Sequence, residues 1–502
     1  MESSTVETRT QEKDKETTTG GTRKAATVLR VGPVPRIEGH LELEVSLAPS
    51  GGAQTVVQAK SSGTMFRGFE QILKGRDPRD ATHYTQRICG VCPVSHGMTS
   101  ALALEQAFGV DAPPNGRILR NLILGADFLM SHVLHFYHLA APDYIDTTGL
   151  LDMSPWAPRP MSADMVKGAT AATLVGHYVD ALAIRRKAHQ MGAIFGGKMP
   201  CSPVFLPGGV TEAATADKIV QFRALLTEVR NFVRDVNVPD AYALGGAFHD
   251  YFSIGRGSGN LLAYGVFNLT ADGNSKLLGR GRLTDGQLST VDPAAIREYV
   301  KYSWYNNSNG NRNPTAGETN PNADKAGAYS WIKAPRYQGK VHEVGPLARM
   351  WINGDYRNGI SVMDRILARA LEAQKIGDAM DEWLNELVPG QPSYTGKGTP
   401  VTGTGIGLSE APRGAVGHWV QISNSVIERY QVISPTSWNA SPRDDSGQAG
   451  ALEQALTGVT VADPNNPVEL LRIVHSFDPC LACSVHVARA DGRRARLEAV
   501  TL

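Results

Sequence analysis

The sequence predicts an α+β protein that is mainly helical, with a core of long helices and small β-sheets at its periphery. Apolar residues recur at spacings of three and four over several long stretches, which is the pattern of helices with a buried face. Strict alternation of apolar and polar residues is confined to short stretches, several of them bounded by glycine or proline. Hydrophobic residues make up 42% of the 502 positions and charged residues 20%, which is typical of a globular protein with a large core.

The first half of the chain contains one hairpin pattern and three helical patterns. Residues 28–60 alternate around a Gly-Gly turn and predict a β-hairpin or small sheet. Apolar side chains recur at helical spacing from Ile118 to Leu139 and predict a long amphipathic helix. Residues 161–195 and 213–236 predict two further helices, separated by a loop rich in glycine and proline.

The second half alternates between strand-rich and helical segments. Residues 250–290 predict strands, and the Asn-, Gly- and Pro-rich stretch 303–325 predicts a loop. Residues 346–388 return to a helical pattern, and Gly403–Gly417 predicts a turn and a strand. We expect short elements from there to the C-terminus.

The core patterns predict a single composite domain over residues 28–486. Residues 1–27 have almost no large apolar side chains, so they cannot offset the entropy of ordering and are expected to form a disordered tail. This segment lacks the apolar core of a secretory signal, and no stretch of roughly 18 uncharged apolar residues predicts a membrane span. The formal net charge of +1 argues against binding nucleic acid or an anionic membrane through bulk charge.

The five cysteines carry the clearest chemical signal. Cys89 and Cys92 form one CxxC pair, Cys480 and Cys483 form a second, and Cys201 stands alone. So few cysteines exclude a disulfide scaffold, whereas four thiolates suit a soft metal such as zinc, nickel or iron. A structural zinc site is one alternative, although zinc ribbons keep their pairs about 15–20 residues apart. A redox disulfide is a weaker alternative because neither pair lies in a thioredoxin-like pattern. Two pairs from opposite ends of a long chain favour a buried catalytic metal centre.

The residues around both pairs closely resemble the two nickel-binding signatures of [NiFe]-hydrogenase large subunits of the respiratory uptake type. The signatures are Arg87-Ile-Cys89-Gly-Val-Cys92-Pro-Val-Ser-His96 and Asp478-Pro-Cys480-Leu-Ala-Cys483-Ser-Val-His486. The resemblance implies the fold of that subunit and the reversible cleavage of H2 into protons and electrons. It continues, in order along the chain, through residues 35–40, 66–70, 74–80, 329–337, 343–349 and 410–414.

The resemblance implies a nickel ion held by all four paired cysteines and an iron that carries CO and two cyanides. Cys89 and Cys480 resemble the terminal nickel ligands, and Cys92 and Cys483 resemble those that bridge to the iron. Heterolytic cleavage of H2 needs a Lewis acid for the hydride and a base for the proton, and Cys480 resembles the thiolate that acts as base. Glu38 resembles the first proton-relay carboxylate, for which burial and a raised pKa are expected. The alternative for Glu38 is a structural glutamate that is salt-bridged to Arg36.

Further residues resemble the surroundings of that centre. Arg413 resembles an arginine poised over the open metal site, with Pro412 lining the same pocket and Asp478 nearby; an ordinary ion pair is the alternative. Thr436 resembles a hydroxyl donor to a cyanide. His96 resembles a donor to a bridging thiolate, although a lone histidine is more often a structural residue.

A hard cation site is also implied by the resemblance. Glu70, the backbone carbonyl near Val432, and His486 resemble the ligands of Mg²⁺ or a similar divalent ion. Residues 487–502 resemble a C-terminal tail that maturation chaperones and an endopeptidase process after nickel insertion, so that the mature chain ends at His486. A permanent C-terminal strand is the alternative.

Electron transfer requires a partner, because no spare cysteines remain for an iron–sulfur chain. We expect an obligate heterodimer with an iron–sulfur small subunit, with a higher oligomer of such heterodimers as the alternative, and membrane contact only through partners. Co-export with that subunit would place the enzyme in the periplasm or at the membrane, with the cytoplasm as the alternative. A hydrogen-sensing regulatory subunit is the alternative function.

Two positions depart from the family pattern. Ser131 precedes His132 where some members carry an aspartate, and Asp127, one turn earlier, is a candidate for the same helix face. Cys201 stands where many members have histidine, and we expect it to be buried or to line a pocket without binding the metal.

Overall fold

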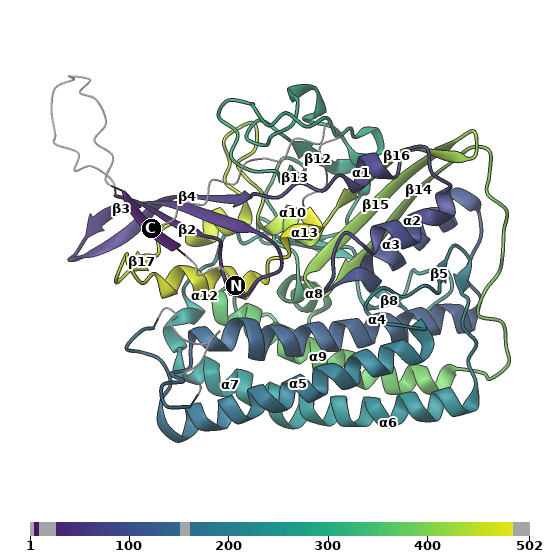
Figure 1. Ribbon diagram of the computed structural model, residues 1–502, viewed down its shortest axis with the longest axis horizontal. Coiled ribbons are helices and arrows are strands. Elements are labelled where there is room, and N and C mark those ends of the chain that lie inside the picture. Colours follow the sequence, from purple (N-terminus) through teal and green to yellow (C-terminus); the bar gives the residue numbers. More distant parts are fainter. Residues whose placement is uncertain (1–4, 10–26, 151–160, 485–502) are drawn as a thin grey trace.

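The computed structural model describes residues 5–9, 27–150 and 161–484 (Figure 1). Long helices form one layer, and two antiparallel sheets with the connecting loops cover it. The fold class agrees with the α+β prediction, although one sheet is not peripheral. No helix in the described ranges is long and apolar enough to cross a membrane.

The N-terminal sheet contains the predicted hairpin. β3 (Leu41–Ser50) and β4 (Ala53–Gly63) pair around Gly51 and Gly52, both of which have positive φ. Alternate residues of β3, from Leu41 to Leu47, are buried, as the sequence pattern predicts. The full sheet has the order β1–β2–β3–β4–β17, in which β1 is Thr5–Arg9, β2 is Thr27–Gly32 and β17 is Thr460–Val461.

The prediction of a disordered tail over residues 1–27 differs from the structure in two places. Thr5–Arg9 forms strand β1 and pairs with β2, and Thr27 is the first residue of β2. Backbone pairing to an existing sheet edge gives this polar segment an order that its composition does not predict. The rest of that segment lies outside the described residues.

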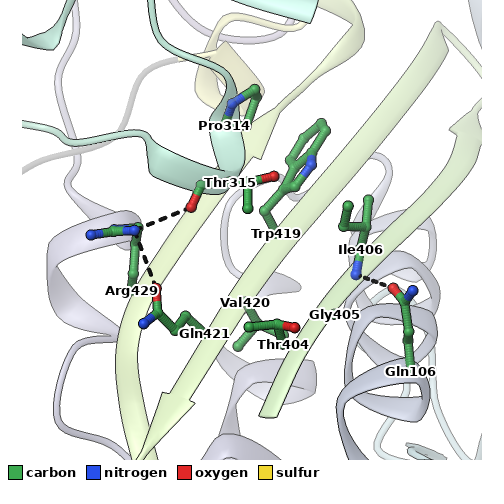
Figure 2. Close-up of a pocket in the computed structure, with 10 residues that line it drawn as sticks. All are labelled: Gln106, Pro314, Thr315, Thr404, Gly405, Ile406, Trp419, Val420, Gln421 and Arg429. Atoms are coloured by element: carbon green, nitrogen blue, oxygen red, sulfur yellow. Dashed lines mark hydrogen bonds between the residues drawn. The ribbon is translucent and has the colours of Figure 1, made fainter. Parts of the chain in front are cut away.

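The second large sheet is made mostly of buried residues. β14 (Gly403–Ala411), β15 (Gly414–Ser423) and β16 (Val426–Ile433) form an antiparallel meander. β14 packs directly on helix α3 (Pro93–Phe108), and a Cβ added at Gly405 would lie 1.8 Å from the carbonyl oxygen of Ala103. Figure 2 shows a surface pocket of about 100 Å³ where these strands meet Gln106 of α3 and the turn at Pro314.

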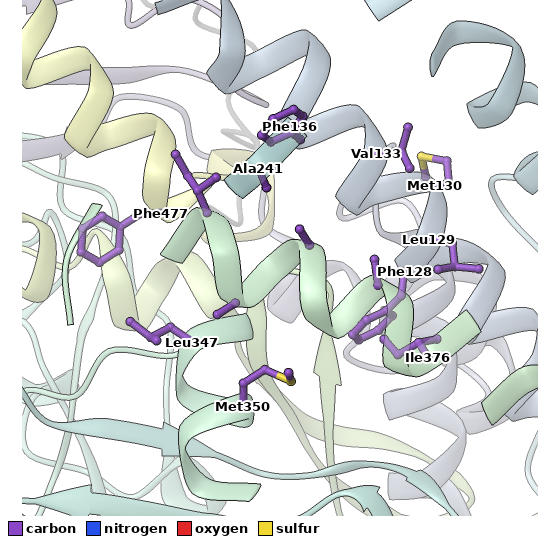
Figure 3. Packing of buried hydrophobic residues seen from close by; sticks show 14 of the residues in the cluster. Phe128, Leu129, Met130, Val133, Phe136, Ala241, Leu347, Met350, Ile376 and Phe477 are labelled. Carbon is purple, nitrogen blue, oxygen red and sulfur yellow. The ribbon is translucent and has the colours of Figure 1, made fainter. Parts of the chain in front are cut away.

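Helix α4 (Pro114–Leu134) is the centre of the helical layer. It contacts α5 (Gly168–Gly196) and α9 (Val362–Glu386), and α6 (Ala216–Phe232) packs on both of these. Figure 3 shows Phe128 of α4 beside Ile376 of α9, and Leu129, Met130 and Val133 of α4 belong to the same buried cluster. The predicted amphipathic helix is therefore buried along nearly its whole circumference. It continues through a π-helical turn, His135–Ala140, into a 3-10 turn at Ala141–Asp143.

The remaining segments agree with the expected patterns. Residues 250–290 form five short strands, and residues 303–325 contain only two 3-10 turns besides loop. The strands are β7 (Leu261–Ala263), β8 (Val266–Asn268), β9 (Lys276–Leu278), β10 (Gly281–Thr284) and β11 (Gln287–Ser289), followed by β12 (Ile296–Tyr299) and β13 (Ala334–Tyr337). The strands β5 (Phe205–Leu206) and β6 (Gly209–Val210) form a short antiparallel pair. The other α-helices are α1 (Phe69–Ile72), α2 (Ala81–Thr85), α7 (Val238–Ala247), α8 (Pro346–Asn353), α10 (Pro435–Asn439), α11 (Ala451–Leu456), α12 (Val468–Phe477) and α13 (Leu481–Ser484).

Candidate metal centre

The structure brings the two CxxC pairs together. Cys92 is the N-cap residue of α3, and Cys480 and Cys483 lie where the chain leaves α12 and enters α13. The Sγ atoms of Cys89 and Cys480 are 3.1 Å apart, those of Cys92 and Cys483 3.3 Å, and all four lie within 4.8 Å of one another. All four side chains are buried and none forms a disulfide.

This group of four sulfur atoms fits a soft metal. The backbone N–H groups of Val91 and Cys92 point at the Sγ of Cys89, at 3.2 and 3.3 Å, which favours a thiolate there. Burial opposes ionisation of Cys89, but hydrogen bonds from the other three cysteines and the charge of Arg413 hold its pKa well below the ordinary value. Sulfur ligands without carboxylates suit nickel, iron or zinc better than Mg²⁺ or Ca²⁺.

Glu38 lies directly beside this sulfur group. Its Oε2 accepts hydrogen bonds from the Cys480 thiol at 3.2 Å and from the backbone N–H of Ala482 at 2.9 Å. Burial raises the pKa of Glu38, and the charge of Cys89 raises it further. Arg36 instead forms an ion pair with Asp143, so the structure does not contain the predicted alternative of an Arg36–Glu38 salt bridge.

Backbone hydrogen bonds hold the segment of Glu38 against the segment of Cys480. The N–H of Glu38 donates to the carbonyl of Pro479, and the N–H of Leu481 donates to the carbonyl of Glu38. A Cβ at Gly39 would lie 2.8 Å from the Cβ of Leu481 and 2.9 Å from the nitrogen of Ala482. Only glycine therefore lets the two segments approach so closely, and Gly39 also has a φ of +80°.

Arg413 lies in the connection between β14 and β15 and is buried. Its Nε is 3.1 Å from Oδ1 of Asp478, and its Nη1 donates to the hydroxyl of Ser131 at 3.2 Å. Thr436 accepts a hydrogen bond from the backbone N–H of Cys480 at 2.9 Å, which places its hydroxyl next to the second cysteine pair. The predicted neighbours Arg413, Asp478 and Thr436 therefore lie around one site.

Ser131 contacts Arg413, and Asp127 contacts a different group. The hydroxyl of Ser95 in α3 lies 3.5 Å from Oδ2 of Asp127, at the limit of a hydrogen bond. Burial raises the pKa of Asp127 well above its ordinary value, and the charge of Cys89 raises it further. Asp478, and not Asp127, forms the ion pair with Arg413.

His96 belongs to a chain of buried polar groups. Its Nδ1 lies 3.1 Å from Nε2 of His418, whose Nδ1 lies 2.8 Å from the hydroxyl of Tyr430. The Nε2 of His96 is buried without a protein partner, and burial lowers its pKa to about 4. Sequence reasoning did not single out His418 or Tyr430, because only the pairing of β15 and β16 brings them beside α3.

Glu70 contacts Val432 through the backbone N–H of that residue, and not through the carbonyl that was predicted as a cation ligand. Oε1 of Glu70 accepts a hydrogen bond from the backbone N–H of Val432 at 2.9 Å. The ammonium of Lys333 lies 3.5 Å from Oε2 of the same carboxylate, and Thr319 donates to that oxygen. His486, together with residues 487–502, lies outside the described residues.

Arg349 is a further residue that sequence reasoning did not assign. It donates to Glu372 from Nε and Nη2, and its Nη1 donates to Glu410 at 2.8 Å. It also donates to the carbonyls of Ala411 and Pro412, directly before Arg413. Arg349 and Glu410 both lie in sequence blocks that resemble the family, and this was the sequence signal that could have identified them as part of the site.

Cys201 is partly buried and lies outside the sulfur group. Its Sγ lies 3.8 Å from the carbonyl oxygen of Gln86, just before the first CxxC pair. The pocket of Figure 2 contains none of the predicted site residues. The candidate centre is therefore an interior site defined by the four paired cysteines.

Comparisons with known proteins agree with this geometry. The model of the nickel-dependent hydrogenase family matches residues 67–171, 163–360 and 352–486. The periplasmic [NiFeSe] hydrogenase large subunit of Desulfomicrobium baculatum is 43% identical, over 92% of this chain and 95% of its own. The hydrogenase-1 large chain of Escherichia coli K12 is 35% identical, over 92% and 96%.

The structure is similar to solved hydrogenases as well. The Ni-Fe-Se hydrogenase from D. vulgaris Hildenborough superposes with a TM-score of 0.88 at 43% identity, covering 92% of this chain and 100% of that chain. The names of these relatives give no support to a hydrogen sensor. A four-cysteine site within this fold also makes nickel, rather than structural zinc, the expected metal. The chain belongs to the nickel-dependent hydrogenase family and is a hydrogenase large subunit.

Proposed function

We propose that this large subunit cleaves H2 reversibly and heterolytically at a Ni–Fe centre held by its four paired cysteines. The observation that carries the proposal is the position of Cys480, whose Sγ belongs to the sulfur group and lies 3.2 Å from Glu38. One thiol thus contacts both the metal site and a carboxylate whose pKa is raised by burial.

We infer that all four cysteines would hold the nickel, Cys89 and Cys480 as terminal ligands, and that Cys92 and Cys483 would also hold an iron that carries CO and two cyanides. When bound, the centre would supply the redox-active Lewis acid for H2 cleavage. The relatives from Desulfomicrobium baculatum and D. vulgaris are named for selenium, whereas all four positions in this chain are cysteine. Sulfur is therefore the proposed donor at every ligand position.

The proton would move between two residues of this chain. Cys480 would hold it at Sγ, and Oε2 of Glu38 would accept it across 3.2 Å. The N–H of Ala482 stabilises the ionised carboxylate, while burial favours the neutral acid, so that both forms are accessible. Such a balance suits a group that accepts and then releases a proton.

Arg413, Pro412, Asp478 and Thr436 would form the remaining wall of the site. The ion pair with Asp478 keeps the guanidinium charged despite burial, so it can face an electron-rich ligand without reorganising. The hydroxyl of Thr436 is proposed as a donor to a cyanide, and His96 as a donor to a bridging thiolate.

Glu70, the carbonyl of Val432 and His486 are proposed to bind Mg²⁺ or a similar divalent ion. Support comes from the place of Glu70, whose Oε1 accepts a hydrogen bond from the backbone N–H of Val432, the residue whose carbonyl is proposed as a ligand. A cation there would share Glu70 with the ammonium of Lys333, which lies 3.5 Å away.

An iron–sulfur small subunit is proposed to carry electrons away from the centre. Four cysteines lie in the metal site, and Cys201 alone cannot hold a cluster. The relatives' names as large subunits imply such a partner. An obligate heterodimer follows.

Maturation is proposed to end at His486, through chaperones and an endopeptidase that removes residues 487–502. The family match, which ends at residue 486, supports this boundary. A periplasmic or membrane-associated location, reached by co-export with the small subunit, is proposed from the periplasmic relative.

The test is substitution of cysteines inside and outside the sulfur group of the complete enzyme. Cys480→Ser should abolish H2 oxidation, because it removes both a metal ligand and the thiol beside Glu38. Cys201→Ser is the matched control and should largely retain activity and nickel. Full activity in the first variant, or a nickel-free wild-type protein, would overturn the proposal.

A further inference from the structure

Asp143 lies where three segments of the chain meet. It ends the 3-10 turn that follows α4, and its side chain is 3% exposed. Oδ1 of its carboxylate pairs with Arg36, in the loop before β3, and Oδ2 pairs with Nδ1 of His475, in the last turn of α12. One buried carboxylate therefore joins the end of α4, the N-terminal loop and α12.

His475 strengthens this junction. Besides its contact with Asp143, its Nε2 lies 2.8 Å from the backbone carbonyl oxygen of Pro35. The imidazole therefore lies between two acceptor oxygens, one from a carboxylate and one from a backbone carbonyl. Arg472, also in α12, donates from Nε and Nη2 to the backbone carbonyl of Asp143 at 3.0 and 2.9 Å.

The two segments tied to Asp143 carry the two groups of the proposed proton step. The loop that contains Pro35 and Arg36 leads within two residues to Glu38, and α12 leads directly to Cys480. Arg36 has a φ of +51°, a conformation that residues other than glycine rarely adopt. Its ion pair with Asp143 holds the loop in this strained geometry, in which Glu38 faces Cys480.

We propose that Asp143 is a positioning residue for proton transfer and that, with Arg36 and His475, it fixes the separation between the Cys480 thiol and the Glu38 carboxylate. The inference rests on the proposed role of Glu38 as relay. In that step the S–H bond of Cys480 breaks and an O–H bond forms at Glu38, without transfer of electrons. Asp143 touches neither group and acts only through the two segments it joins.

The test is Asp143→Asn in the nickel-loaded complex. Asparagine keeps the shape of the side chain but removes the charge that holds Arg36 and His475. Turnover of H2 should fall on the order of 10- to 100-fold because the donor and acceptor separate, while KM for H2 and nickel content stay unchanged. The solvent deuterium isotope effect on turnover should rise, because proton transfer becomes rate-limiting. A purely structural role would reduce the yield of loaded enzyme without changing the isotope effect, and that result would overturn the inference.

Asp444→Asn is the matched control. Asp444 is also buried and pairs with a buried arginine, Arg336, at 2.9 Å. The hydrogen bonds of that pair lie among residues 335–336 and 441–448, and none of them involves Arg36, Glu38, Asp143 or His475. This variant should keep the wild-type turnover and isotope effect.

Arg36→Gln keeps the inference testable if Asp143→Asn fails to fold, because Arg36 is 22% exposed. It should reproduce the higher isotope effect, and Arg36→Lys should restore most of the turnover. Glu38→Gln tests the relay role of Glu38 separately from the positioning role of Asp143. If Glu38→Gln keeps full turnover, the relay itself is wrong and the inference fails with it. If Glu38→Gln loses turnover while Asp143→Asn and Arg36→Gln behave as wild type, only the inference is overturned.

Discussion

At the scale of single residues, Arg413 shows how the site depends on geometry as well as charge. Its guanidinium spans Asp478 on one side and Ser131 on the other. Arg413→Lys keeps the positive charge, but an ammonium cannot reach both partners in a fixed orientation. We expect about 100-fold slower H2 oxidation at unchanged nickel content, since the loss of one preorganised donor costs about this much.

The comparison for this prediction is Arg223→Lys, at a partly exposed ion pair with Asp381 on the outer helices. That variant should keep its rate in the same hydrogen-uptake assay. Equal rates for Arg413→Lys and the wild type would show that the guanidinium geometry has no part in the reaction.

The sequence predicted the residues that carry distinctive chemistry, but it did not predict the residues that hold these in position. The two CxxC pairs, Glu38 and Arg413 could be named because they lie in short motifs. Arg349 and Asp143 act through contacts between segments far apart in the chain, such as Arg349 with Glu410 and Asp143 with His475. No local spacing encodes such contacts, so the fold has to be known first.

At the scale of elements, the contact between β14 and α3 is a backbone contact. Gly405→Ala would place a Cβ 1.8 Å from the carbonyl oxygen of Ala103, and a helix backbone cannot move aside as a flexible side chain can. We expect a loss of about 3 kcal/mol in the free energy of unfolding, from overpacking. Denaturant unfolding monitored by circular dichroism measures it.

Gly398→Ala is the control for this measurement, because a Cβ there meets no atom within 4 Å. An unchanged free energy of unfolding in Gly405→Ala would contradict the close packing of strand and helix. Gly403, Gly405 and Gly407 lie on one face of β14, against α3. This alternation was a sequence signal for a covered strand face, and it explains why a sheet expected at the periphery lies in the interior.

At the scale of the whole molecule, the metal centre joins segments from both ends of the chain. Cys89 and Cys92 precede α3, whereas Cys480 and Cys483 follow α12. Metal binding to the native arrangement adds its binding free energy to folding. Protein from nickel-starved cells should therefore unfold at a lower temperature than nickel-loaded protein, by calorimetry.

The same comparison of nickel-starved and nickel-loaded protein in two variants shows whether the shift in unfolding temperature comes from the four-cysteine site. Cys201→Ser should show the full nickel-dependent shift in unfolding temperature, and Cys89→Ser, which lacks a ligand, should show little. A shift of equal size in Cys89→Ser would mean that nickel stabilises the protein elsewhere.

The distance along the chain between the paired cysteines also determines when, during synthesis, all four become available to a metal. Cys89 and Cys480, whose sulfur atoms end up 3.1 Å apart, are separated by 391 positions. At roughly 5–20 residues per second, a ribosome needs on the order of 20–80 seconds to travel from one to the other. During that interval the first pair has left the ribosome without its counterparts, exposed to oxidants and to competing metals. The site cannot close on any metal with all four sulfurs until the second pair has also been synthesised, so correct metal choice is a problem of timing as well as of affinity.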